Sequence, residues 1–233
     1  MFRTTCVILA IALFGCSDGD SDTDVGGGPK DSGPDITSTP EGGAPMCGPN
    51  IYPCPPYGVQ SGDVAANLEF VGYSDPKEHC TDHKDKVMDI DNARKISFRE
   101  FHQPEAGCDS KKRDLLWVMV SAGWCGPCRT EVQQTQTEYA KGSVDSRVGI
   151  VNVVFETDKL GVPITDAFLK KWITSFNLTL PAVMDPSFKM GAYFDKKATP
   201  FNMLVETKTM KILYRQTGGD LSNIGKKISE YFN

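Results

Sequence analysis

The stretch Leu115–Glu131 reads LLWVMVSAGWCGPCRTE, and it decides the fold. Its first six residues, Leu115–Val120, are all apolar and rich in branched and aromatic side chains, which is typical of a strand buried on both faces of a sheet. Small residues follow, and a pattern of good helix formers then continues to about Lys141. The predicted order is therefore a buried strand, a tight turn and a helix.

Two cysteines lie where this turn becomes the helix. Cys125 is expected at the helix N-terminus, where unpaired N–H groups and the helix dipole favour a thiolate. Cys128 follows within one turn, so Cys125 can attack a substrate disulfide and Cys128 can resolve the mixed disulfide. Pro127 fits the first turn because it has no amide hydrogen to leave unpaired. The alternatives are an inert structural disulfide or half of a zinc site, but zinc needs a second closely spaced cysteine pair.

The segment Trp124-Cys125-Gly126-Pro127-Cys128 after a hydrophobic strand resembles the active site of the thioredoxin fold. The resemblance implies an α/β protein with a central mixed β-sheet flanked by helices. It also implies a cis-proline that faces the two cysteines, is preceded by Thr and is followed by an apolar strand. Thr199 and Pro200, followed by Phe201–Val205 and a partner strand at Lys211–Tyr214, match this second element.

The spacing between the two elements resembles the TlpA/ResA-like branch, which carries an inserted strand and helix. Cys128 and Pro200 are 72 residues apart, more than in small thioredoxins. The chain has material for the insertion in a strand at Gly149–Phe155, a helix at Thr165–Ser175 and a short strand with a turn at Ala182–Pro186. A thioredoxin fold with a TlpA-like insertion and an N-terminal extension is therefore expected.

Glu131 falls where that branch often carries a semi-buried acid, and the resemblance implies that it assists proton transfer to or from Cys128. The alternative is an ordinary helix acid that faces solvent. The sequence departs from the family at two positions near the motif. Val132 stands close to where the family often has Pro, and Met119 replaces the buried Asp of small thioredoxins.

The N-terminus has the features of a secretory signal peptide over residues 1–15. Arg3 precedes an apolar run, Val7–Phe14, which is far too short for a membrane-spanning helix of about 20 residues. Leu13–Cys16 resembles the lipobox of bacterial lipoproteins, which implies that Cys16 carries a lipid. The alternative is a soluble secreted protein.

A tether follows the signal peptide. Residues 17–45 hold seven Gly, four Pro and seven acidic residues against one Lys, with no aromatic residue, so they cannot bury enough apolar area to order themselves. We therefore expect a lipidated Cys and a disordered acidic linker over 16–45 and a thioredoxin-like domain over 46–233. Within that domain, 46–110 is the N-terminal extension and 111–233 the core. From Met46 onward 23 basic residues balance 23 acidic ones and no basic run appears, so no nucleic-acid partner is expected.

The composition limits the class of protein and its compartment. The chain has 233 residues, of which 39% are hydrophobic, and this excludes a collagen, a polytopic membrane protein and a wholly disordered chain. Eight cysteines are too many for a typical reduced cytosolic protein, so an oxidising compartment is expected.

Four of the eight cysteines are predicted to form structural disulfides: Cys47, Cys54, Cys80 and Cys108. Four cysteines allow three pairings. A Cys47–Cys54 disulfide would close a Pro-rich loop at the start of the domain, and a Cys80–Cys108 disulfide would close a charge-rich loop.

A metal site is a weaker alternative role for two of these cysteines, together with the three histidines. The candidate ligands are His79, Cys80, His83, His102 and Cys108. Their spacing matches no metal-binding template, so neither a metal nor any other cofactor is expected.

These observations favour a thiol-disulfide oxidoreductase held by lipid outside the cytoplasm, on the periplasmic side of the inner or outer membrane. The resemblance implies that it reduces disulfides in client proteins. A reductase outside the cytoplasm needs a membrane electron donor, and a monomer is expected. One alternative is a thiol peroxidase of the same superfamily, but Ala122 stands where peroxiredoxins place Thr, three residues before the reactive cysteine Cys125. The other is a non-catalytic, thioredoxin-like binding lipoprotein.

Overall fold

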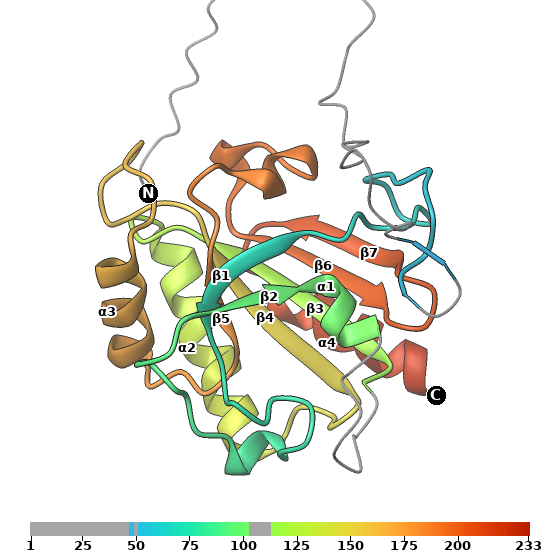
Figure 1. Ribbon diagram of the computed structural model, residues 1–233, viewed down its shortest axis with the longest axis horizontal. Helices are drawn as coiled ribbons and strands as arrows, with labels where there is room; N and C mark the ends of the chain where they lie inside the picture. The colour runs from blue at the N-terminus through green and yellow to red at the C-terminus, as the bar shows by residue number, and fades with distance from the viewer. Residues whose placement is uncertain (1–46, 49–50, 103–112) are drawn as a thin grey trace, which may run out of the picture. The chain divides into compact units, whose positions relative to one another are not determined.

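The described strands form one seven-stranded sheet in the order β2-β1-β5-β4-β3-β6-β7 (Figure 1). The computed structural model describes residues 47–48, 51–102 and 113–233. The strands are β1 (Glu69–Tyr73), β2 (Arg94–Ser97), β3 (Leu115–Ser121), β4 (Val148–Val154), β5 (Ala182–Met184), β6 (Phe201–Glu206) and β7 (Lys211–Thr217). The α-helices are α1 (Phe98–His102), α2 (Gly126–Lys141), α3 (Asp166–Phe176) and α4 (Leu221–Phe232). The sheet and its flanking helices confirm the predicted α/β class.

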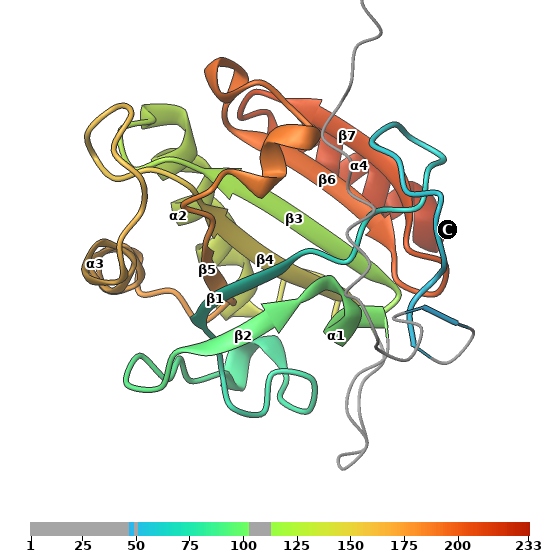
Figure 2. The same ribbon diagram turned by 45° about the horizontal axis from the view of Figure 1, so that its top comes forward.

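The sheet is mixed, as expected. Strand β4 runs parallel to both β3 and β5, whereas β6 is antiparallel to β3 and β7 is antiparallel to β6. On the other side β1 pairs antiparallel with both β5 and β2. The N-terminal extension therefore adds two strands to the same sheet, which the turned view in Figure 2 makes visible.

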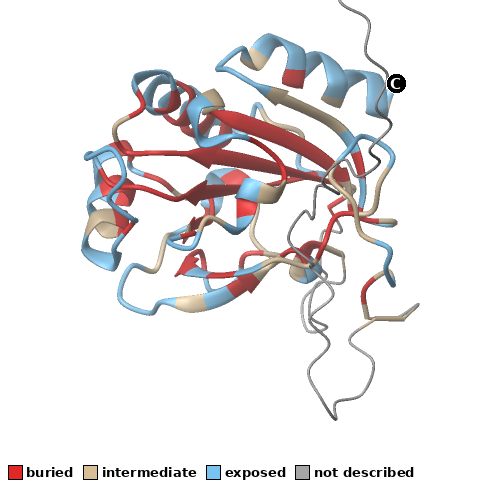
Figure 3. Cartoon of the chain, turned by 90° about the horizontal axis from the view of Figure 1, so that it is seen from above, coloured by how far each residue is buried: buried red, intermediate tan, exposed pale blue. Residues whose placement is uncertain are grey.

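The two central strands position the site because they are buried along their whole length. All seven residues of β3 and all seven of β4 are buried, which explains their continuous apolar sequence. Trp117 and Met119 of β3 pack with side chains of α2, α3 and α4, while Val118 and Val120 pack with α1 and with a 3-10 helix at Lys189–Ala192. Figure 3 shows the buried strands between helices whose outer surfaces are exposed.

The insertion expected between β4 and β6 is present as α3 and β5. Thr165 caps α3 by accepting a hydrogen bond from the Phe168 N–H, so the helix begins at Asp166, one residue later than predicted. Two 3-10 helices, Lys189–Ala192 and Lys196–Ala198, then lead from β5 to Thr199.

The parts of the chain outside the described residues carry several predictions that stay predictions. They include the signal peptide, the lipidated Cys16, the tether and Cys108, whose pairing with Cys80 is therefore not described. Cys47 and Cys54 are described, and a disulfide joins them. No helix in the described part of the chain combines the length and apolarity needed to cross a bilayer.

Candidate active site

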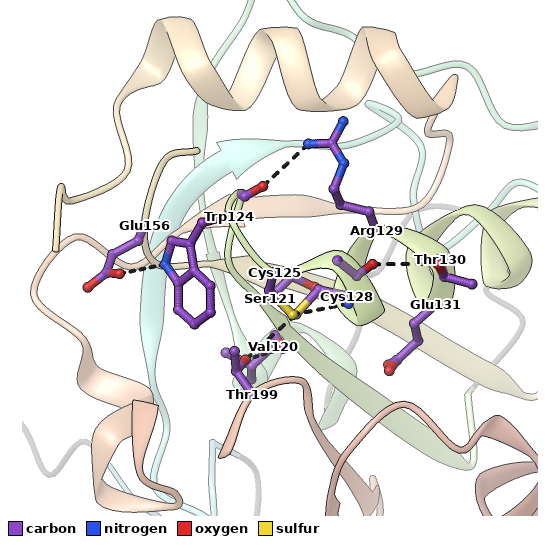
Figure 4. Close-up of a disulfide and its surroundings, with 12 residues drawn as sticks. Val120, Ser121, Trp124, Cys125, Cys128, Arg129, Thr130, Glu131, Glu156 and Thr199 are labelled. Atoms are coloured by element: carbon purple, nitrogen blue, oxygen red, sulfur yellow. Dashed lines mark hydrogen bonds between the residues drawn. A yellow bond between two sulfur atoms is a disulfide. The ribbon is translucent and has the colours of Figure 1, made fainter. Parts of the chain in front are cut away.

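Cys125 is the N-cap residue of α2. Its backbone is extended, with φ −82° and ψ 108°, and its sulfur accepts a hydrogen bond of 3.1 Å from the Cys128 N–H. Pro127 lies in the first turn of the helix, where the missing amide hydrogen costs nothing. A disulfide joins Cys125 and Cys128 (Figure 4). After reduction, the same N–H and the helix N-terminus stabilise a thiolate at Cys125.

Both cysteines of the disulfide are buried. Cys125 is 3% exposed and Cys128 is fully buried, whereas Gly126 and Pro127 between them are exposed. A side chain added at Gly126 would meet no other atom within 4 Å, so packing does not require glycine there. Of the two cysteines, Cys125 is the more exposed.

Backbone hydrogen bonds join the loop before the cysteines to the residues that follow β4. The Gly123 N–H donates to the Glu156 carbonyl at 3.0 Å, and the Trp124 N–H donates to the Thr157 carbonyl at 3.1 Å. A Cβ at Gly123 would come within 2.7 Å of the Thr157 backbone and 2.4 Å of the Phe168 ring. Glycine is therefore needed for this close approach.

Trp124 is held by a buried carboxylate. Its indole N–H donates to Glu156 Oε2 at 2.7 Å, and the same oxygen accepts from the Gly161 N–H at 3.0 Å. The Lys196 ammonium lies 3.1 Å from the other oxygen. Burial acts to raise the pKa of Glu156, but the bonds from Gly161, Trp124 and Lys196 together hold that pKa below its ordinary value. Glu156 is therefore ionised at neutral pH. Nothing in the sequence around Glu156 marks it as a site residue, so it could not be predicted from the sequence.

Thr199 and Pro200 lie beside the disulfide, as the resemblance implies. The Thr199–Pro200 peptide bond is cis, and Pro200 is buried. The Thr199 hydroxyl lies 3.8 Å from Cys128 Sγ and donates to the Val120 carbonyl at 3.4 Å. The two segments, 71 residues apart in sequence, thus meet at the sulfur of Cys128.

Glu131 is buried on α2, on the side of the disulfide opposite Trp124 (Figure 4). It is 2% exposed, so the alternative of a solvent-facing helix acid is wrong. Burial raises the pKa of Glu131 to about 7, although a hydrogen bond from Asn202 Nδ2 to Glu131 Oε1, 2.7 Å long, acts in the opposite direction. A carboxyl group with this pKa exchanges protons readily at neutral pH.

The polar partner of Glu131 comes from the neighbouring strands. Met119, which stands where small thioredoxins have a buried Asp, is in register with Asn152 of β4 and Asn202 of β6. Both asparagines are fully buried. They were not among the predicted site residues, although an Asn inside an apolar strand signals that a buried polar partner must exist.

The three histidines each contact other groups than the cysteines within the described part of the chain. His79 Nε2 lies 3.8 Å from Glu100 Oε2, His102 Nδ1 lies 2.6 Å from the Thr207 carbonyl, and the His83 ring packs against Tyr139. Within residues 47–48, 51–102 and 113–233, no three side chains of the His, Cys, Asp and Glu types form a group that could hold a metal ion.

Comparison with known proteins identifies the fold. No protein-family model and no curated protein sequence matches the chain. Among solved structures, it is similar to a protein described as a candidate disulfide isomerase from Bacteroides thetaiotaomicron, with 14% identity, a TM-score of 0.50, and 74% of this chain and 89% of that one covered. It is also similar to a candidate thiol:disulfide interchange protein, DsbE, from Chlorobium tepidum, with 19% identity, a TM-score of 0.48 and coverage of 75% and 99%.

A third similar structure is the exposed lipoprotein thioredoxin Etrx1 of Streptococcus pneumoniae, with 17% identity, a TM-score of 0.45, and 71% of this chain and 99% of that one covered. At these identities the likeness concerns the fold. The mixed sheet with its flanking helices matches that of thioredoxin-fold structures. The chain has the thioredoxin fold.

Proposed function

We propose that this protein is a thiol-disulfide oxidoreductase that reduces disulfides of client proteins through Cys125 and Cys128. The observation that supports this most strongly is the hydrogen bond from the Cys128 N–H to the sulfur of Cys125 at the N-terminus of α2. It favours a thiolate at Cys125 once the pair is reduced, and the thiolate is the nucleophile in disulfide exchange.

The reaction has two exchange steps. In the first, the Cys125 thiolate attacks one sulfur of the client disulfide, so a mixed disulfide forms and the other client sulfur leaves as a thiolate. In the second, Cys128 loses its proton and attacks Cys125, which restores the Cys125–Cys128 disulfide and releases the second client thiolate. Two electrons pass from the pair to the client, and the leaving thiolates take up the protons.

Glu131 is the proposed acid and base for the second step. It lies one helical turn after Cys128 on α2, and its pKa near 7 allows it to take up and return a proton. Among the described contacts no hydrogen bond joins Glu131 to either sulfur, so the transfer would pass through a water molecule.

Trp124, Thr199 and Pro200 form the proposed client surface. Trp124 is partly exposed and fixed by Glu156, while Thr199 reaches the sulfur of Cys128. An extended client segment would add its backbone beside Thr199 and Pro200, with its cysteine against Cys125.

The N-terminal sequence supports a proposed location outside the cytoplasm. A signal peptide, a lipid on Cys16 and an acidic tether would hold a monomeric domain on the periplasmic side of a bacterial inner or outer membrane. Reduction of clients in that compartment consumes the Cys125–Cys128 dithiol, so a membrane electron donor would have to regenerate it.

Disulfide turnover by the reduced full chain tests this proposal. We expect reduction of both a small aromatic disulfide and a protein disulfide, loss of both in Cys125→Ser, and little change in the matched control Cys54→Ser. Preferential turnover of hydrogen peroxide would instead establish the peroxidase alternative. Unreactive thiols at Cys125 and Cys128 in the reduced chain would establish the non-catalytic alternative.

A further inference from the structure

Three buried side chains form a chain of hydrogen bonds from the centre of the sheet to Glu131. The indole N–H of Trp117 donates to Asn202 Oδ1 at 2.7 Å, and Asn202 Nδ2 donates to Glu131 Oε1 at 2.7 Å. Trp117 is 5% exposed and Asn202 is fully buried. These hydrogen bonds therefore connect β3 through β6 to α2 within the buried interior.

Trp117 determines which way the Asn202 amide points. An indole nitrogen only donates hydrogen bonds, so the atom that faces it must be the amide oxygen. The amide nitrogen then has to face Glu131, and it offers a donor whether the carboxyl group is ionised or protonated. The side chain of Asn202 is thus unable to turn over without leaving the Trp117 N–H buried and unpaired.

The second oxygen of Glu131 lies near Gly219, Pro127 and Pro200. Glu131 Oε2 is buried without a hydrogen-bond partner in the described part of the chain. A Cβ built on Gly219 would lie 3.6 Å from this oxygen and 3.7 Å from side-chain atoms of both Pro127 and Pro200. Because Asn202 occupies Oε1, the proton is directed to Oε2, beside the two prolines that flank the disulfide.

Few other titratable groups surround Glu131. On α2 the sulfurs of Cys125 and Cys128 are joined in a disulfide and do not titrate, and in the loop before α4 Asp220 is exposed and accepts a hydrogen bond from the Ser222 N–H. On β3 and β6 the neighbours in register are Met119 and Asn202, which do not titrate. Burial and the Asn202 bond are accordingly the influences that set the pKa of Glu131.

We propose that Asn202, oriented by Trp117, is a positioning residue that fixes Glu131 so that its free oxygen exchanges a proton with Cys128. This inference rests on the proposed function for its catalytic part, but the contact itself exists without it.

Asn152 provides a matched control. It lies on the opposite side of Met119 and makes equivalent buried bonds, since its Oδ1 accepts from the Trp172 indole at 2.9 Å and its Nδ2 donates to Ser121 Oγ at 2.9 Å. Asn152→Leu and Asn202→Leu therefore each leave one buried indole N–H unpaired, but only Asn202→Leu removes a donor from Glu131.

The first readout is the titration of the Glu131 carboxyl carbon, followed by carbon-13 NMR in the oxidised full chain and assigned by its absence in Glu131→Gln. We expect Asn202→Leu to move the inflection upward by about 0.5 to 1 pH unit, because the bond that favours the ionised form is lost. Asn152→Leu should leave it in place. If Asn202→Leu fails to fold, Asn202→Asp keeps an acceptor for Trp117 but offers no donor, and it should move the inflection upward as well.

The second readout is the pH profile of disulfide exchange. Asn202→Leu should slow exchange at pH 7 by about two- to fivefold and recover at higher pH, because fewer Glu131 side chains are ionised to accept the Cys128 proton. In a Glu131→Gln background the same change should add nothing. An unmoved titration, an equal movement in Asn152→Leu, or equal slowing in the Glu131→Gln background would overturn the proposal. Loss of exchange in the unaltered chain would overturn the proposed function, while the titration would still report whether Asn202 positions Glu131.

Discussion

The indole nitrogen of Trp124 donates a hydrogen bond to Glu156 Oε2 at 2.7 Å, which ties the residue before the first cysteine to the end of β4. Glu156 is 3% exposed and also accepts hydrogen bonds from Gly161 and Lys196. The Glu156 carboxylate is thus hydrogen-bonded both to the Trp124 side chain and to Gly161, in the loop that leads to the inserted helix α3.

This arrangement predicts that Glu156 supports client reduction through Trp124. Glu156→Leu leaves the Trp124 N–H without its acceptor and should lower exchange with a protein disulfide by about tenfold, at a stability cost of about 1 to 3 kcal/mol. Glu156→Gln retains an acceptor for the indole and should lose much less activity. The exposed Asp158, changed to Leu, is the control. Equal losses in the Leu and Gln variants would show that the charge of Glu156, and not its hold on Trp124, is what matters.

The two cysteines are predicted to have different roles. In Cys128→Ser the mixed disulfide between Cys125 and the client cannot be resolved, so covalent complexes should accumulate and disappear on reduction. Cys125→Ser should form few or none. Non-reducing gel electrophoresis of the full chain from bacterial cells measures this directly. Complexes that form mainly in Cys125→Ser would reverse the assignment.

Glu131 is predicted to make stability fall as the pH rises. Its pKa is about 7 in the folded protein, above the ordinary value of 4.5 expected in the unfolded chain. The folded state therefore binds the extra proton between these values, and the stabilisation present below pH 4.5 is lost as the pH passes through about 7. The loss is on the order of 3 kcal/mol from this group alone.

Urea unfolding of the oxidised full chain at several pH values checks this. Relative to Glu131→Gln, the unaltered protein should lose stability steadily from pH 4.5 to 8. Glu138→Gln, on the exposed side of the same helix, should show a small effect of opposite sign, because the pKa of Glu138 is lowered by bonds from Lys141 and Ser143. A stability difference between Glu131→Gln and the unaltered chain that does not change with pH would refute the assignment.

The N-terminal sequence predicts lipid attachment at Cys16. In a bacterial host, the full chain should incorporate a labelled fatty acid and sediment with membranes, and Cys16→Ser should do neither. Cys6→Ser is the matched control, because Cys6 lies within the predicted signal peptide and should have no effect. Labelling that survives in Cys16→Ser would locate the anchor elsewhere.

Much of the fold follows from local sequence. The run Leu115–Val120 predicts β3 because a doubly buried strand is apolar along its whole length, and α2 ends at the predicted Lys141, where Gly142, with φ 71°, is its C-cap. The helix near Thr165 is also local, since its start depends on a capping side chain. These elements are recognisable because the residues that determine them are adjacent in the chain.

The candidate site was predicted only in part, for a reason that is equally physical. The cysteines and Glu131 lie within one helix, so their spacing is readable, whereas Asn202 and Glu156 reach the site through strand register and loop packing. Register joins Met119 to Asn202 across 83 residues, and no local pattern encodes that distance. Asn202 in the apolar run of β6 was nevertheless a usable signal, because a buried amide requires a partner.

The reduction potential of the Cys125–Cys128 pair tests the central claim most directly. The full chain would be equilibrated in thiol buffers of defined potential, with free thiols trapped and counted. The Cys-Gly-Pro-Cys motif and the proposed role as a reductase predict a value at or below about −250 mV, near that of thioredoxin. A value of about −120 to −180 mV would identify an oxidant or an isomerase and would contradict the account.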